Sequence, residues 1–231
     1  MDANTIAACT GARLAAAELY APHLSVAMSA YQIDAKPLRA AMFLANAGHE
    51  SGRLTTVVES LNYGVSALLL SFGRHRISEA DARAYGRTAT RAADQVAIAN
   101  CVYGGAWGAK NLGNVRPGDG WLMRGRGLFQ STGRANAARL TARLRARLPG
   151  LAVPDFEATP EALSLPQWAA LSAADFWDGR GLNALADRGD FDGCCDSINL
   201  GSKTAKVGDS NGWQERLELF EAGKSALGIA P

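Results

Sequence analysis

Apolar residues recur along this chain at the spacing of helices rather than of strands. Leu38, Met42 and Ala45 share one face of a predicted helix, with Pro37 at its first position and Gly52 as its C-terminal cap. No segment shows the alternation of apolar and polar residues that is typical of a half-buried strand. The pattern therefore predicts a mainly α protein.

Further helices follow from the same spacing and from the Gly and Pro residues that interrupt it. An Ala-rich helix is predicted over residues 5–20, and Pro22 marks its end. The Gly-rich stretch from Gly104 to Gly120 is predicted to be loop, because residues 116–120 have strong turn chemistry. Other helices are expected over about 24–31, 134–148, 167–178 and 211–226, with three short ones within 64–104.

Composition narrows the class of protein. With 231 residues, 48% of them hydrophobic, the chain can bury a sizeable core as one domain or as one domain with two lobes. A net charge of +2 is too small for a protein that binds nucleic acid by neutralising phosphates. No apolar run approaches the roughly 18 residues that span a bilayer. A secretory signal would begin with basic residues, but this sequence has Asp2 near its N-terminus. We therefore expect a chain made in the cytoplasm without a signal peptide.

The sequence contains no recognisable set of metal ligands. Its four cysteines lack a Cys-x-x-Cys spacing, so free thiols in a reducing compartment are expected. His49 and Glu50 lack the second histidine of a zinc-protease helix, because Arg53 stands at that position. We expect neither a metal ion nor a cofactor.

Two glutamates are candidates for acid–base chemistry. Glu50 ends the predicted apolar helix, where the partial negative charge of the helix terminus and apolar neighbours suit a general acid. An exposed glutamate at a frayed helix end is the alternative interpretation. Glu59 follows beyond a Gly-containing turn that lets the two carboxyl groups lie on facing walls of a cleft.

The segment from Trp121 to Arg134 also has the composition of a binding site. Gly125 and Gly127 begin like a phosphate-binding loop, but Gln130 replaces the third glycine and no Lys-Ser/Thr pair follows. The glycines instead indicate close approach of the backbone to a substrate or to a neighbouring segment. The Gln-Ser-Thr sequence that starts at Gln130 adds polar groups able to hold water or sugar.

Together these blocks resemble glycoside hydrolase family 19, and more closely the phage and prophage endolysins of that family. The matching blocks are His49-Glu50-Ser51-Gly52, Glu59-Ser60-Leu61-Asn62-Tyr63 and the stretch from Pro117 to Gln130, with Ile98 to Gly104 and Ile198-Asn199 also fitting. They follow in the same order over about residues 35–220. The resemblance implies a lysozyme-like, two-lobed fold, with an active-site cleft between a larger helical body and a smaller helical lobe of about 64–113. Residues 1–231 would form one catalytic domain, with no separate wall-binding domain.

The resemblance also implies a role for each matching residue. Glu50 corresponds to the general acid, Glu59 to the general base and Thr132 to the hydroxyl residue that helps to hold the attacking water. The implied substrate-binding residues are Arg126, Gln130, Asn136, Asn199 and Arg216, and the two arginines would neutralise and orient the acids. Tyr63, shortly after Glu59, and Trp121, beside the Gly-rich loop, are further candidates for binding sugar because of their position in the sequence. Leu200 replaces the family's usual glycine and residues 201–206 form an altered loop, so the contacts near Asn199 depart more from the family than the acids do.

The implied reaction is hydrolysis with inversion, which needs two carboxyl groups roughly 6.5–9.5 Å apart and a water between one of them and the sugar. The expected substrate is the glycan strand of bacterial peptidoglycan, or alternatively chitin, because both are β-1,4 polymers that contain N-acetylglucosamine. A lytic transglycosylase that uses Glu50 alone and a non-catalytic wall-binding module remain alternatives. We expect a monomer that binds no nucleic acid, inserts into no membrane and acts on the cell wall after release from the bacterial cytoplasm.

Three arginines, Arg139, Arg143 and Arg147, share one stripe of the helix predicted over residues 134–148. Such a stripe is either a solvated helix face or a surface that attracts an anionic cell wall or outer membrane. The sequence alone leaves both interpretations open.

Overall fold

The computed structural model describes residues 1–230, and it confirms the prediction of a mainly α protein. Within these residues the only β pairing consists of three isolated bridges. The helices are α1 (Ala3–Thr10), α2 (Leu14–Ala30), α3 (Pro37–Glu50), α4 (Val65–Ser71), α5 (Glu79–Tyr85), α6 (Gln95–Tyr103), α7 (Gly105–Leu112), α8 (Asp119–Leu122), α9 (Arg134–Arg147), the 3-10 helix η1 (Pro160–Ser164), α10 (Pro166–Gly179), α11 (Leu182–Asp187), α12 (Phe191–Asn199) and α13 (Trp213–Ala226). No helix among these residues combines the length and the apolar character needed to cross a membrane.

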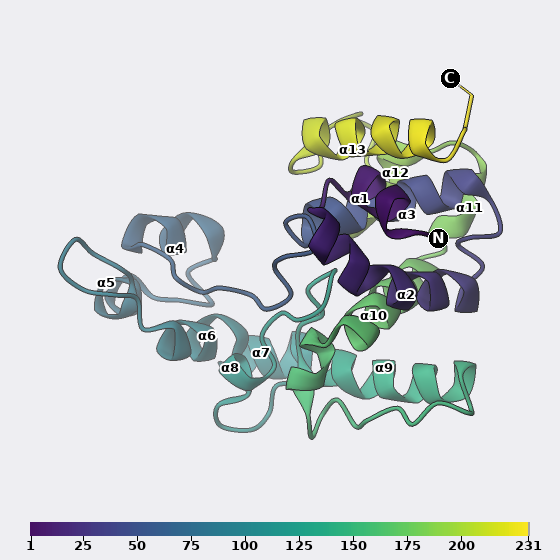
Figure 1. The fold of residues 1–231 in the computed structure, drawn as a ribbon. Helices are drawn as coiled ribbons and strands as arrows, with labels where there is room; N and C mark the ends of the chain where they lie inside the picture. The colour runs from purple at the N-terminus through teal and green to yellow at the C-terminus, as the bar shows by residue number, and fades with distance from the viewer. Residues whose placement is uncertain (231) are drawn as a thin grey trace.

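Two hydrophobic clusters divide the helices between them. The larger cluster joins α1, α2, α3 and the helices from α9 to α13. The smaller cluster buries apolar side chains between Leu61 and Val102, contributed mainly by α4, α5 and α6. In Figure 1 these short helices extend to one side of a body built from the longer ones. Tyr103 and Trp121 pack at the edge of the smaller cluster.

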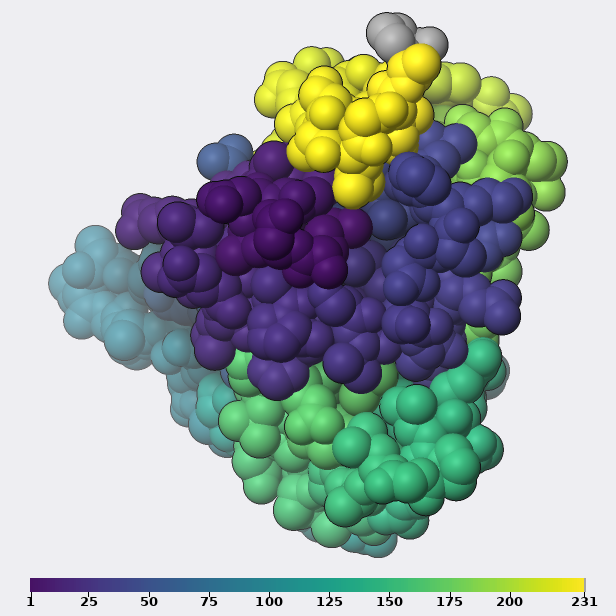
Figure 2. All heavy atoms as spheres, turned by 45° about the vertical axis from the view of Figure 1, so that its right-hand side comes forward, coloured from purple at the N-terminus to yellow at the C-terminus, as the bar shows by residue number. Residues whose placement is uncertain are grey.

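Helix α3 is the centre of the larger cluster. Its residues 40–48 are all buried, and a helix that is covered on every side belongs to a protein interior. Helices α1 and α13 both pack against it. Figure 2 shows the N-terminal residues of this body lying between the C-terminal helix above and α9 and α10 below. The packing fixes the end of α3, and therefore the position of Glu50, which is partly exposed there.

Gly48 allows α1 to approach α3 closely. A Cβ atom at position 48 would lie 2.4 Å from the carbonyl oxygen of Thr10. Because that contact is with backbone, Gly48→Ala is expected to lower the free energy of unfolding by about 1–3 kcal/mol, as overpacked cores do. Urea denaturation measures the change, with Gly150→Ala as control, since nothing lies within 4 Å of a Cβ there. Equal unfolding midpoints for the two variants would contradict the prediction.

The predicted helix over residues 5–20 is wrong in its middle and at its C-terminal end, and the separate helix predicted over about 24–31 is part of α2. The chain breaks at Gly11, whose φ of 66° ends α1, and α2 then continues through Pro22. Proline removes the helical hydrogen bond to the carbonyl of Glu18. Both Pro22 and Glu18 are exposed, so water can hydrogen-bond to that carbonyl in place of the missing N–H.

The stretch from Gly104 to Gly120 is not all loop, because it contains α7 and α8. Here a glycine serves packing rather than a turn: a Cβ at Gly108 would lie 2.0 Å from the carbonyl oxygen of Tyr103. The short helices α11 and α12 were not predicted. The predicted helices over 134–148, 167–178 and 211–226 correspond to α9, α10 and α13.

Candidate active site

A minimal β arrangement places Glu59 and Thr132 on either side of Gly125. Val58 pairs antiparallel with Arg126, and Arg126 pairs antiparallel with Ser131. The Glu59 N–H donates to the Gly125 carbonyl at 2.9 Å, which fixes the register. In antiparallel pairing, that register places Glu59, Gly125 and Thr132 in the next row, with their side-chain positions on one face.

Gly125 keeps the middle of this row open. Its N–H donates to Glu59 Oε2 at 3.0 Å. A Cβ atom at position 125 would lie 3.2 Å from the Glu59 Cβ and 2.9 Å from Gln130 Oε1. The glycine therefore allows its backbone to approach the carboxylate and leaves room beside the amide group of Gln130.

Tyr103 holds the second oxygen of Glu59. Its hydroxyl donates to Glu59 Oε1 at 2.5 Å. Burial, and then the nearby negative charge of Glu59, raise the pKa of the Tyr103 hydroxyl, so it remains a donor. The guanidinium of Arg76 lies over the rings of Tyr103 and Trp107, at 5.3 Å and 3.9 Å from the ring centroids. Tyr103 is not among the site residues predicted from the sequence, although it lies within the block from Ile98 to Gly104.

Glu50 is paired with Arg216, which reaches it from α13. Arg216 is fully buried, and besides its hydrogen bond to Glu50 Oε1 it donates to Asn46 Oδ1 at 2.6 Å and to the Asn211 carbonyl at 3.0 Å. The Glu50 side chain is 22% exposed. The sequence predicts an apolar neighbourhood for Glu50. This prediction is wrong in one respect, because α13 places the buried cation of Arg216 at the end of α3.

A second pair ties the same two helices together. His49 Nδ1 lies 2.7 Å from Glu215 Oε2, and Arg53 contacts the other oxygen of Glu215 at 3.3 Å. The hydrogen bond from His49 is the main cause that lowers the pKa of the Glu215 carboxyl. Gly212 has a φ of 70°, and a Cβ there would lie 2.0 Å from the His49 ring. The start of α13 is thus packed directly on the end of α3.

Arg126 occupies a different position from the one implied by the resemblance. Its guanidinium donates to the carbonyls of Leu122 and Arg124, at 2.6 Å and 3.4 Å, rather than to either glutamate. Arg124 and Arg76 are the arginines that Glu59 influences: burial lowers the pKa of each, and the charge of Glu59 opposes that effect. The Arg124 guanidinium lies 3.5 Å from the ring centroid of Trp121, so it covers one face of that ring.

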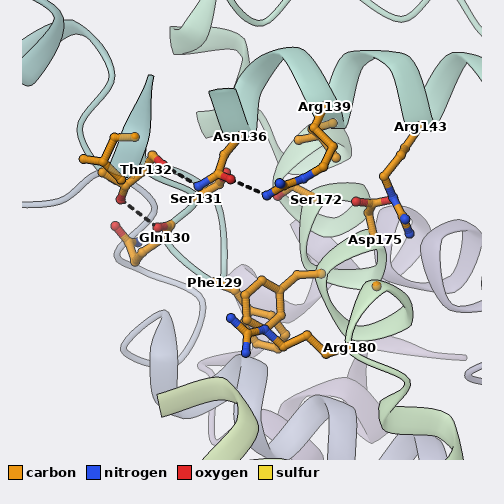
Figure 3. A pocket seen from close by; sticks show the side chains of 14 residues that line it. Phe129, Gln130, Ser131, Thr132, Asn136, Arg139, Arg143, Ser172, Asp175 and Arg180 are labelled. Carbon is orange, nitrogen blue, oxygen red and sulfur yellow. Dashed lines mark hydrogen bonds and ion pairs between the residues drawn. The ribbon is translucent and has the colours of Figure 1, made fainter. Parts of the chain in front are cut away.

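A cavity of about 520 Å³ adjoins the row of Glu59 and Thr132, between α9 and α10. Gln130, Thr132 and Asn136 all line it, as Figure 3 shows. Asn136 Nδ2 donates to the Thr132 carbonyl at 2.6 Å, and the Thr132 hydroxyl donates to the Gln130 carbonyl at 3.0 Å. Gln130 Oε1 is buried without a hydrogen-bond partner. The two glutamates are not among the lining residues, whereas Thr132, which the pairing places across Gly125 from Glu59, is one of them.

Tyr63 and Asn199 belong to different parts of the fold. Tyr63 packs on Phe72 in the smaller cluster, and burial together with the charge of Glu59 raises the pKa of its hydroxyl. Asn199 lies at the end of α12, where its Oδ1 accepts the Asn211 N–H at 2.8 Å. Asn199 thus holds the loop before α13, and no hydrogen bond in residues 1–230 joins its side chain to either glutamate.

Comparison with known proteins supports a relationship to glycoside hydrolases. The sequence matches no protein-family profile. A segment of 103 residues, 44% of this chain, is 40% identical to a Haemophilus influenzae protein described as a glycosyl hydrolase family 19 domain-containing protein, and it spans 46% of that relative. The fold is similar to that of chitinase C from Streptomyces griseus HUT6037, with a TM-score of 0.55, 20% identity, and coverage of 98% of this chain and 76% of that chain. The chain therefore shares its fold with chitinase C, and over less than half its length it is similar in sequence to a protein described as containing a family 19 domain.

Proposed function

We propose that this protein is a glycoside hydrolase that cleaves β-1,4 bonds in the glycan strands of bacterial peptidoglycan, with inversion at the anomeric carbon. Glu50 is the general acid and Glu59 the general base. The family 19 similarity and the chitinase fold support the reaction class. The observation on which the proposal depends is the row of Glu59, Gly125 and Thr132 beside a polar cavity.

The surroundings of Glu59 suit a base that binds water. Donors from Tyr103 and Gly125 hold its two oxygens in place. Gln130 Oε1 is a buried acceptor without a donor, and such groups in proteins are normally satisfied by water or by a ligand. A water bound beside Gly125 can donate to Glu59 and to Gln130 Oε1, while the N–H of an N-acetyl sugar is an alternative donor to the amide.

The reaction then requires two proton transfers. Glu59 takes a proton from the water as its oxygen bonds to the anomeric carbon, and Glu50 gives a proton to the departing glycosidic oxygen. Glu50 is left as a carboxylate, and the guanidinium of Arg216 stabilises that charge through the hydrogen bond already formed. A cleft between body and smaller lobe, with roughly 6.5–9.5 Å between the carboxyl groups, is part of this proposal.

Chitin is the second candidate substrate, favoured by the similarity of the fold to chitinase C. Purified protein incubated with peptidoglycan and with chitin oligomers distinguishes the two. Hydrolysis adds one water for each bond that is cleaved and leaves a new reducing end. Products of this mass with new reducing ends, released from peptidoglycan, support the proposal. Products with anhydro ends would instead identify a lytic transglycosylase, and cleavage of chitin alone would replace the proposed substrate.

Gly125→Ala tests the row without removing a charged group. The added Cβ would press on the Glu59 Cβ and on Gln130 Oε1, so we expect the turnover number to fall at least about 10-fold, because small displacements of reacting groups cost that much or more. Gly64→Ala is the control, since its Cβ would meet only the Arg87 carbonyl at 3.7 Å. Rates of glycan hydrolysis and melting temperatures are compared. A Gly125→Ala variant with the wild-type rate would contradict the proposed position of the water.

A further inference from the structure

The cavity continues past the candidate sugar-binding residues toward a group of arginines. Arg139, Arg143 and Arg180 line this part, together with one acid, Asp175. Figure 3 shows Thr132 and Gln130 at one end of the cavity and Arg143 and Asp175 toward the other. The proposed hydrolysis assigns no role to these charged residues.

Tertiary contacts divide the arginine stripe of α9 into paired and unpaired members. Arg143 donates to Asp175 at 2.7 Å and to Asp178 at 3.1 Å. Arg147 also contacts Asp178 at 3.1 Å, and its guanidinium lies over the Tyr31 ring. These two arginines are held in ion pairs with α10, and Arg139 is the member of the stripe that is not.

Two arginines at the cavity have no carboxylate partner within residues 1–230. Arg139 donates to the side-chain oxygen of Asn136, and Arg180 donates to the Gly201 carbonyl at 2.6 Å. Arg180 also lies over the Phe176 ring, 4.8 Å from its centroid. A guanidinium has five N–H donors, so each of these residues keeps donors for a ligand. Because Arg143 offsets Asp175, the lining retains a net charge of +2 from Arg139 and Arg180.

We infer that Arg139 and Arg180 form a carboxylate-binding subsite for the peptide arm of peptidoglycan, an inference that rests on the proposed function. The planar fork of a guanidinium matches a carboxylate in shape and charge. Chitin bears only hydroxyl and N-acetyl groups, whereas the peptide arms of peptidoglycan bear carboxylates. The subsite therefore selects between two polymers that the acid–base residues cannot distinguish.

The spacing along α9 agrees with such an arm. Asn136 and Arg139 are three residues apart, a rise of about 4.5 Å, and both line the cavity. A sugar that hydrogen-bonds to Asn136 consequently has its substituents within reach of the Arg139 guanidinium. Arg180 approaches from the end of α10, so the two cations belong to different helices.

Charge-neutralised substrate provides the sharpest test. Native peptidoglycan, the same material with its carboxyl groups converted to amides, and a neutral N-acetylglucosamine hexamer are compared as substrates. We expect the Arg139→Gln, Arg180→Gln double variant to raise KM for native peptidoglycan at least about 10-fold, the loss typical of a charged hydrogen bond. Its kinetics on the amidated material and on the hexamer should equal those of wild type. Arg188→Gln, at an exposed arginine after α11 and outside the cavity, should match wild type on all three.

A binding measurement separates this inference from the hydrolase proposal. Co-sedimentation with native and amidated cell walls is measured in a Glu59→Gln background, which leaves the walls intact. The double variant should bind native walls at least about 10-fold more weakly and amidated walls equally well. Equal binding to native walls, or equal losses on both materials, would overturn the subsite. Carboxylate-dependent binding without release of new ends by the wild-type protein would support the subsite and overturn the hydrolase proposal.

Discussion

Glu59→Gln will reduce hydrolysis of peptidoglycan by at least about 100-fold, as will Glu50→Gln, since general acid and base groups each contribute about 10²–10⁴-fold. Glutamine keeps the size of the side chain but can neither accept the proton of the attacking water nor donate one to the glycosidic oxygen. Release of reducing ends and the loss of turbidity of cell-wall suspensions measure the effect.

The expected folding of these variants differs between the two positions. Glu59→Gln retains an oxygen that can accept the hydrogen bond from Tyr103 or from Gly125, so its melting temperature should change little. Glu50→Gln replaces the carboxyl group that binds the buried Arg216, so some loss of stability is expected there. Glu221→Gln, at an exposed pair with Lys224, is the matched control for charge removal. If either active-site variant keeps a rate within 10-fold of wild type, the assignment of that glutamate is wrong.

Asp119→Asn is expected to destabilise the fold by about 3–5 kcal/mol, the cost of breaking a buried ion pair from one side. Asp119 is 2% exposed and binds the Arg134 guanidinium through both oxygens, at 3.0 Å and 2.5 Å. One of those oxygens also accepts the Arg116 N–H at 2.9 Å. The amide of asparagine replaces one acceptor by a donor that would face the buried guanidinium. Urea denaturation measures the loss, and Glu79→Gln, in an exposed pair with Arg83, should show a far smaller one.

The same pair makes stability depend on pH in a defined direction. Hydrogen bonding to Arg134 holds the pKa of the Asp119 carboxyl below its ordinary value of 3.8. A carboxyl whose pKa is lower in the folded state contributes stability above the unfolded pKa and loses it as pH falls through the folded pKa. Between about pH 7 and pH 5 its contribution is therefore constant, and below about pH 4 it declines. If Asp119→Asn has the same acid dependence of unfolding as wild type, the pair does not act this way.

This pair also matters to the candidate site. Arg134 is the first residue of α9, and its N–H donates to Asn114 Oδ1 at 2.9 Å. Asn114 in turn donates to the carbonyl of Tyr103, the residue that holds Glu59. The start of α9, and with it the wall of the cavity that contains Asn136, is thus tied to the support of the candidate base.

Much of the helical framework could be predicted because helices are local. The face formed by Leu38 and Met42, with Pro37 at its start, predicts α3 from residues that are near neighbours in the chain. The errors arose where burial or packing overrides local preference. Pro22 is tolerated within α2 because it faces solvent, and Gly108 lies inside α7 at a position where a Cβ atom would meet the Tyr103 carbonyl.

In the candidate site, too, some features could be predicted from the sequence and others only from the packing. Glu50, Glu59 and Thr132 could be selected from the sequence because their blocks resemble a known family, and Gly125 because glycines permit close approach. The Glu50–Arg216 pairing agrees with the role that the resemblance implies for Arg216, but the contact of Tyr103 with Glu59 could not be derived from local pattern, since it joins a helix and a separate loop.

By itself the sequence determined the helical class of this protein, the position of most helices and the identity of the candidate acids, because periodicity and motif order are properties of neighbouring residues. Only the tertiary structure decided which groups hold each carboxylate and which arginines of α9 remain unpaired. Those contacts depend on how elements distant in the sequence pack and in which register they pair. A pattern of neighbouring residues specifies neither the packing nor the register.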